Sequence, residues 1–265
     1  MSGFLMPSTF NPPQNTIQIP ATIGATLQVL ATGKVGFAGT AVAVPGTLPD
    51  LLWWLRSDPI LGTNTVAVPT LGNSTPWILG PLATLSTGTV TVDSTQLNGL
   101  NVLKWPAAAS GRYVLAQPYQ FAAGFTVFAV VKPSASTNQT LLGAAASGLQ
   151  VDINSGANGF DLTKATIGVI ASSSVAMTAG TWYQINATLN TTTAAYAFRM
   201  ARAAAGSGTG GFSPITGVTS GIGYNVATGA SDLSSSVAEI AVYGRVLTGA
   251  EVTALETYAH TKWGV

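Results

Sequence analysis

The chain has 265 residues, a formal net charge of +1 and 7% charged residues, against the roughly 25% that is usual for soluble domains. Its ten basic residues form no stripe, which argues against nucleic-acid binding, and no run of about 18 apolar residues predicts a membrane span. Cysteine is absent, so disulfides and thiolate metal sites are excluded.

The low charge also bears on association. A surface built mainly of Ser, Thr, Asn, Gln, Gly and Ala offers little electrostatic repulsion between copies of the chain. We therefore expect a homo-oligomer whose first partners are other copies of itself. A soluble monomer of unusual composition is the alternative.

Residues 1–49 form the first predicted segment, an extended N-terminal arm. Six prolines interrupt it, Lys34 is its only charged residue, and residues 16–19, 26–31 and 34–44 are short β-prone runs. Because Phe4-Leu5-Met6 is stopped by Pro7 and no basic residue precedes Lys34, we expect no signal peptide. Such an arm buries little by itself, so we expect it to lie on a neighbouring subunit or on its own sandwich.

Residues 50–265 are predicted to form one all-β domain. Turn signals such as Asn98-Gly99 and Asn158-Gly159 separate its short apolar runs. We expect these runs to pair in sequence, for example 124–132 with 139–144, and to close into a two-sheet antiparallel jelly-roll sandwich. The predicted strands are residues 87–92, 102–105, 124–132, 139–144, 149–153, 160–162, 167–171, 182–190, 194–201 and 237–243.

The last part of the chain has the clearest local signals. Residues 201–211 are rich in Gly and Ala and predict a flexible loop, and residues 237–243 alternate as a half-buried strand. A short C-terminal α-helix follows, with Thr248 as N-cap and Glu251 completing a capping box. Its apolar face is predicted to contain Val252, Leu255, Tyr258 and Ala259, and Lys262 and Gly264 end it.

A strand that runs through Arg-x-Leu-Thr into a helix ending Tyr-x-x-x-Lys-Trp-Gly resembles the C-terminal end of the concanavalin A-like lectin/glucanase superfamily, especially its laminin-G-like members. Three upstream segments extend the resemblance: residues 52–58 to the family's opening strand, 125–133 to its central strand and 180–187 to its Trp-led strand. The resemblance implies a jelly-roll domain and a bias toward sugar or surface binding.

No catalytic residue is predicted. Glucanases of this superfamily use a carboxylate cluster on one strand, and the chain has only three glutamates. We expect Glu251 to cap the helix, Glu256 to face solvent, and Glu239 to lie at a sheet edge or in a local ion pair. No cofactor is expected.

Ligand-binding candidates are few. Trp77, Tyr113, Tyr119 and Tyr224 occur in turn-like surroundings and are candidates for stacking on a sugar, whereas Trp53, Trp54, Trp105, Trp182 and Trp263 are expected in the core. No calcium loop can be recognised, so no metal site is predicted. Asp152, Asn154 and Asp161 are the weak candidates for one, against capping of turns by their side chains.

Two functions from different classes fit these features. The first is a non-enzymatic structural protein on the surface of a bacteriophage virion, such as a capsid decoration protein or a fibre or spike subunit, with a major capsid or other virion protein as partner. The second is an extracellular or cell-surface carbohydrate-binding module or adhesin that recognises glycans. A glycoside hydrolase is the remaining alternative.

Overall fold

In the computed structural model, strands β10 (Gly124–Pro133) and β19 (Ser235–Tyr243) pair antiparallel at the centre of a sandwich, with Thr126 opposite Tyr243. Every residue of β19 is buried, and in β10 only Lys132 is not. An all-buried strand needs cover on both faces of its sheet. The half-buried strand predicted for residues 237–243 is therefore wrong in its burial, because the C-terminal helix covers the second face.

The structure describes residues 26–29, 35–38, 45–58, 70–71, 78–79, 83–107, 111–116, 123–134, 137–145, 148–153, 159–164, 168–210, 219–230 and 232–265. The chain divides into two units, Met1–Ala41 and Val42–Val265. In the first unit, β1 (Thr26–Val29) and β2 (Val35–Ala38) form an antiparallel hairpin. The expected strand at residues 16–19 lies outside the described residues.

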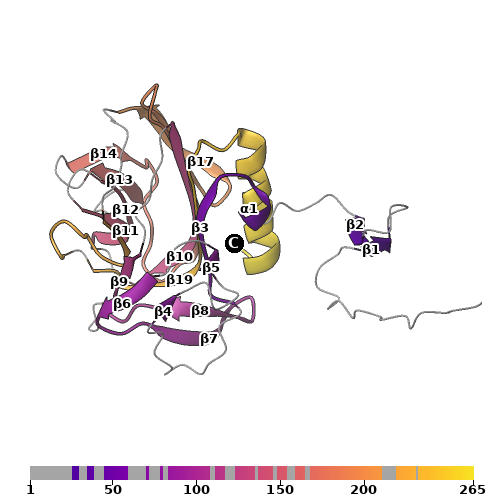
Figure 1. Cartoon of the computed structure of the whole chain (residues 1–265), viewed down its shortest axis with the longest axis horizontal. Helices are drawn as coiled ribbons and strands as arrows, with labels where there is room; N and C mark the ends of the chain where they lie inside the picture. Colours follow the sequence, from indigo (N-terminus) through magenta and orange to yellow (C-terminus); the bar gives the residue numbers. More distant parts are fainter. Residues whose placement is uncertain are drawn as a thin grey trace, which may run out of the picture. The chain divides into compact units, whose positions relative to one another are not determined.

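One sheet of the sandwich, sheet I, contains nine described strands. Their order is β17-β16-β15-β10-β19-β3-β5, and the β7-β8 ribbon joins through β8, which pairs with β19 (Figure 1). Its strands besides β10 and β19 are β3 (Leu51–Arg56), β5 (Ile78–Leu79), β7 (Thr91–Leu97), β8 (Leu100–Lys104), β15 (Tyr183–Asn190), β16 (Ala195–Met200) and β17 (Ala203–Thr209).

The other sheet, sheet II, contains eight described strands in the order β14-β13-β12-β11-β18-β9-β6-β4. A backbone hydrogen bond of 2.6 Å from Ser174 to Ala205 joins the β14 and β17 edges of the two sheets. The strands of sheet II are β4 (Thr70–Leu71), β6 (Ala83–Thr87), β9 (Arg112–Leu115), β11 (Gln139–Ala144), β12 (Leu149–Ile153), β13 (Phe160–Lys164), β14 (Gly168–Ser172) and β18 (Ser220–Ile222).

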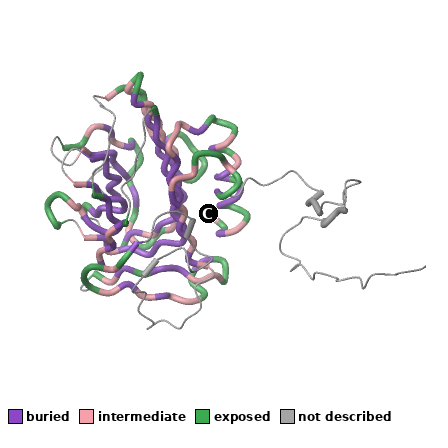
Figure 2. The backbone as a smooth tube through the Cα atoms, viewed as in Figure 1, coloured by how far each residue is buried: buried purple, intermediate pink, exposed green. Residues whose placement is uncertain are grey.

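The main core lies between the two sheets. Phe160 of sheet II meets Phe198 of sheet I edge to face, with ring centroids 4.8 Å apart. Trp53 and Trp105 are buried in the same core, as predicted. The β-branched and leucine side chains of the inner faces fill the rest of the space between the two sheets. Figure 2 shows the buried residues following the facing strands of both sheets.

A second apolar cluster lies between the outer face of sheet I and α1 (Gly249–Trp263). The capping box is present, and Gly264 at φ +76° takes the left-handed conformation that ends the helix. The face predicted from helical spacing packs here: Val252, Leu255, Tyr258 and Ala259 are buried against sheet I. The expected burial of Trp263 is confirmed as well, because its ring closes the C-terminal end of this cluster.

Two local predictions are wrong. β10 and β11 belong to different sheets and do not pair, because β10 takes β15 and β19 as neighbours. The predicted loop at residues 201–211 is largely strand β17, which pairs with β16. Ala201 and Arg202 have φ of 48° and 67°, and positive φ at both central residues is the geometry of a tight two-residue hairpin turn.

The predicted architecture is confirmed: an all-β sandwich of two antiparallel sheets with one short C-terminal helix. Several strands begin or end within one residue of the predicted bounds, among them β11, β12 and β15. Within the described residues, no helix has the length and apolar character needed to cross a membrane.

Replacing Gly143 by alanine is expected to destabilise the sandwich by about 3 kcal/mol, since overpacking of this severity has a large cost. A Cβ at Gly143 would stand 1.9 Å from the backbone oxygen of Tyr224, which cannot move aside as a flexible side chain could. Gly249→Ala is the control, because no atom lies within 4 Å of a Cβ at that position. Guanidinium unfolding of both variants measures the difference, and equal stabilities would contradict the packing argument.

Candidate functional site

The buried carboxylate of Glu239 fixes helix α1 on sheet I. Glu239 is fully buried in the central strand β19 and accepts hydrogen bonds from Trp54 Nε1 at 2.6 Å, Trp263 Nε1 at 2.6 Å and Tyr258 Oη at 2.9 Å. Lys262 Nζ adds an ion pair at 3.2 Å. A buried carboxylate is tolerated only when it is paired and hydrogen-bonded, and here strand β3 and the C-terminal half of α1 supply the donors.

Lys262 connects Glu239 to the residues at the end of β3 by ion pairs. Its Nζ lies 2.8 Å from Asp58 Oδ1, and Nη2 of Arg56 donates a hydrogen bond to Asp58 Oδ2 at 2.9 Å. Burial opposes ionisation of Asp58, but the hydrogen bond from Arg56 and the charge of Lys262 win, so the pKa of Asp58 is lowered. The ion pair predicted for Glu239 is confirmed, whereas the predicted edge position is wrong because β19 lies between β10 and β3.

A second buried glutamate fixes the middle of the helix. Glu256 is 2% exposed, and its two carboxylate oxygens accept from Nε and Nη2 of Arg199 on β16 at 2.6 and 2.9 Å. Asn186 on β15 donates to the same carboxylate at 3.4 Å. The prediction that Glu256 faces solvent is therefore wrong, because its side of the helix lies over β15 and β16.

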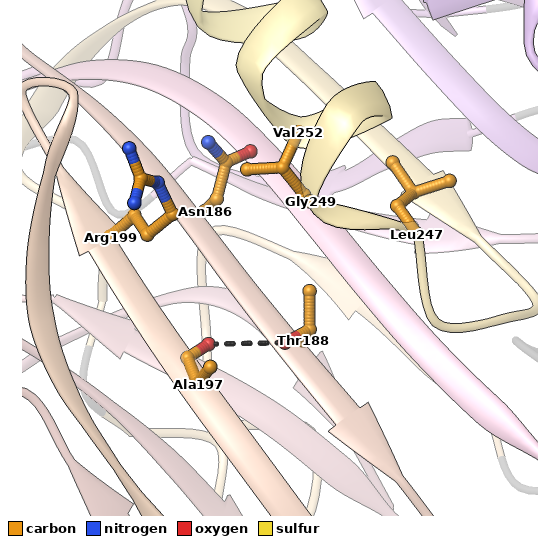
Figure 3. A pocket seen from close by; sticks show the side chains of 7 residues that line it. All are labelled: Asn186, Thr188, Ala197, Arg199, Leu247, Gly249 and Val252. Atoms are coloured by element: carbon orange, nitrogen blue, oxygen red, sulfur yellow. Dashed lines mark hydrogen bonds between the residues drawn. The ribbon is translucent and has the colours of Figure 1, made fainter.

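These contacts leave a groove beside the N-terminal turn of α1, between the helix and strands β15 and β16 (Figure 3). We call it the helix groove; its volume is about 250 Å³. Asn186 and Thr188 come from β15, where alternate residues point away from the core. The residues that line the groove are Asn186, Thr188, Ala197, Arg199, Leu247, Gly249 and Val252.

The polar side of the helix groove is held rigid. Glu256 and the carbonyl oxygen of Arg202 occupy Nε and Nη2 of Arg199, while Nη1 has no hydrogen-bond partner among the described residues. The Arg199 side chain is 35% exposed. Leu247 and Val252 supply apolar surface on the helix side, so the groove presents fixed polar groups next to an apolar wall.

Two of the weak metal candidates come together on the opposite sheet. Asp152 on β12 and Asp161 on β13 are direct partners across the strands, and both are buried. Burial raises the pKa of Asp152, while the hydroxyl of Thr140, which donates to it at 2.6 Å, works against that rise. Asn154, the third candidate, lies outside the described residues.

The aromatic candidates are scattered. Tyr113 is fully buried in the core against Trp105, so its ring has no exposed face, and burial raises its pKa. Tyr224 is 8% exposed and lies over Gly221 of sheet II, with the Arg112 guanidinium 5.5 Å above its ring. Trp77 and Tyr119 lie outside the described residues. The described part of the chain therefore gathers no aromatic platform from these candidates.

The groove-lining Asn186, Thr188 and Arg199 were not predicted as site residues. Within residues 182–190 the polar Gln184, Asn186 and Thr188 alternate with apolar residues, which predicts an outward face but does not distinguish solvent from a groove. What makes the groove is the helix docked across that face. The only feature of the sequence that could have indicated the groove was the opposite charge of Arg199 and Glu256, which allows them to form an ion pair.

Comparison with known proteins supports the fold. No protein-family model and no curated protein matches the chain. Among solved structures, the Trypanosoma rangeli sialidase in complex with sialic acid matches at a TM-score of 0.51 and 16% identity, over 87% of this chain and 35% of that one. This chain thus spans about a third of the sialidase.

Two single domains of larger proteins are also similar. Domain 4 of AbnA, a GH43 extracellular arabinanase from Geobacillus stearothermophilus, in complex with arabinotriose, gives a TM-score of 0.50 and 17% identity over 66% of this chain and 87% of that one. The binding domain of Paraclostridial Mosquitocidal Protein 1 gives 0.53 and 13%, over 72% and 52%. At such identities the likeness to these neighbours concerns the fold alone. No finding supports a virion protein.

Replacing Glu239 by glutamine is expected to destabilise the protein by about 3 kcal/mol, because Lys262 loses a buried counter-charge and one of the donors loses its acceptor. Urea unfolding measures the loss. Gln96→Ala is the control, since Gln96 is exposed and hydrogen-bonds only to Ser94 among the described residues. A Glu239→Gln variant as stable as the wild type would show that the carboxylate does not hold the helix.

The capping carboxylate predicts a pH dependence. Hydrogen bonds from Arg245 chiefly, and from Thr248, lower the pKa of Glu251 to about 2 in the folded protein from its ordinary 4.5. A lowered folded pKa stabilises the protein above pH 4.5, and this contribution disappears as the pH falls toward 2. The side chain is partly exposed, so we expect a small effect. Stability measured against pH should flatten in Glu251→Gln, and an unchanged slope would contradict the assignment.

Proposed function

We propose that this protein is a non-catalytic carbohydrate-binding module or adhesin that recognises glycans outside the cell or at its surface. The observation that carries the proposal is the helix groove, where polar side chains held in place by a buried ion pair stand beside an apolar wall. A sialidase solved with sialic acid and an arabinanase domain solved with arabinotriose are similar to this chain and add support at the level of the fold.

The chemistry of the groove suits a sugar. A pyranose or furanose ring has an apolar C–H surface and an edge of hydroxyl groups that both donate and accept hydrogen bonds. Arg199 Nη1 offers a donor, the amide of Asn186 and the hydroxyl of Thr188 offer mixed groups, and Val252 offers apolar contact. Because Glu256 already fixes Arg199, little side-chain entropy would be lost when a ligand binds.

The placement of the carboxylates favours binding over hydrolysis. Hydrolysis of a glycosidic bond usually needs two carboxyl groups on either side of it. No Asp or Glu is among the described residues that line the helix groove, and both oxygens of nearby Glu256 are engaged by Arg199. The predicted partners on a virion, and self-association through the arm, stay predictions.

Filling the groove tests the proposal. The chain is first screened on an array of printed mono- and oligosaccharides, and the affinity for the strongest binder is then measured by calorimetry. Ala197→Leu places a branched apolar side chain in the groove, so we expect affinity to fall at least about tenfold, or about 1.4 kcal/mol.

Ala195→Leu is the matched control. Ala195 lies on the same strand and the same face two residues away, is exposed, and does not line the groove. It should bind as the wild type does. The proposed function fails if no printed glycan is retained, and the groove is excluded as the site if Ala197→Leu binds with unchanged affinity.

A further inference from the structure

Within the described residues, seven of the nine acidic residues of this chain have a basic partner, and the two for which the structure shows none are neighbours. With 7% charged residues, almost every carboxylate is matched. Asp152 and Asp161 make no ion pair within the described part of the chain. The matched pairs are Asp50–Arg245, Asp58–Arg56, Asp93–Lys104, Asp232–Arg112, Glu239–Lys262, Glu251–Arg245 and Glu256–Arg199.

The two unmatched carboxylates share one face of sheet II. Val151 and Leu162 point into the core between the sheets, so their neighbours Asp152 and Asp161 point to the outer face. As direct cross-strand partners they have Cβ atoms roughly 5 Å apart. Yet Asp152 is 2% and Asp161 0% exposed. Two like charges this close, removed from water and without a cation, strongly disfavour each other.

The hydrogen bonds around the pair are incomplete, and the buried atoms that lack a partner are all oxygens. Asp152 accepts from Thr140 at 2.6 Å and from the amide nitrogen of Gln150 at 3.2 Å. Both oxygens of Asp161 and the amide oxygen of Gln150 are buried with no hydrogen-bond partner among the described residues, while the hydroxyl of Thr163 contributes a hydrogen bond to Asp152. Gln150 and Thr163 face each other across β12 and β13, next to the aspartates.

We propose that these residues bind a hard cation, with Ca²⁺ as the ion that fits best. Three unpartnered oxygens beside a second carboxylate are the ligand type that Ca²⁺ takes, and its charge would neutralise the two aspartates. The described residues bring no third acidic or histidine side chain to the group, so neutral oxygens complete the set. Asp161 with both oxygens, Asp152, Gln150 and Thr163 are the proposed ligands.

A proton shared by the two aspartates is the alternative. A shared proton would satisfy one oxygen on each carboxyl group and would leave the second oxygen of Asp161 and the amide oxygen of Gln150 without a partner. A cation accounts for all of them at once. The site is on sheet II, whereas the helix groove is on sheet I, so this inference does not rest on the proposed function.

Refolding in the presence or absence of calcium tests the site. Because the ligands are buried, the full chain is unfolded in guanidinium with a chelator and refolded with either 1 mM CaCl₂ or chelator, so that the ion can enter during folding. We expect one Ca²⁺ per chain by native mass spectrometry and a melting temperature about 5 °C higher with calcium.

Asp161→Asn should bind no Ca²⁺ and lose the calcium-dependent shift, while its melting temperature in chelator equals or exceeds that of the wild type, because a buried like charge has gone. Asp232→Asn is the control, since Asp232 is paired with Arg112 outside the group, and it should keep the shift. The proposal is overturned if calcium neither binds nor stabilises the wild type, or if Asp161→Asn keeps the shift. A calcium-insensitive wild type that Asp161→Asn stabilises would indicate the shared proton instead.

Discussion

The fold depends on the burial of one charge, the carboxylate of Glu239, in the central strand of sheet I. Moving an ionised carboxylate out of water costs several kcal/mol, and this cost is offset only if donors surround it. Trp54 of β3 and Tyr258, Lys262 and Trp263 of α1 do so from two directions. Apolar contacts would allow the helix to sit at several places on the sheet, but these directional hydrogen bonds can form in only one placement of the helix. The docking of α1 is therefore specified by polar groups and stabilised by apolar ones.

That docking creates the helix groove. Because the last turn of α1 is fixed at Glu239 and the middle at Glu256, the first turn must pass over the outward face of β15 and β16. Arg199 then has two roles: its guanidinium neutralises Glu256, and its side chain lines the groove. The groove is thus a consequence of how the helix is held, and its polar groups are rigid for the same reason.

Local signals were predictable from the sequence, and long-range polar pairings were not. The capping box of Thr248 and Glu251, the helical apolar face and the strand β12 depend on residues close in sequence. Glu239 and Glu256 were misplaced because their partners lie elsewhere: Trp54 is 185 residues from Glu239, and Arg199 is 57 from Glu256. Spacing cannot show that a helix will cover a polar strand residue, so a buried glutamate and a solvated one have the same local pattern.

The outer faces of the two sheets place buried carboxylates in contrasting states. On sheet I, each oxygen of Glu239 has a donor or a cation, and the satisfied carboxylate holds α1 on the sheet. On sheet II, Asp161 is as deeply buried as Glu239 but has none within the described residues. Since the other seven carboxylates each have a basic partner, an unmatched pair at 0 to 2% exposure is more readily explained by cation binding than by tolerance of the cost of burial. Burial therefore gives Glu239 a structural role, because its partners are present, and makes the aspartate pair a cation-binding site, because its partners are not supplied by the described residues.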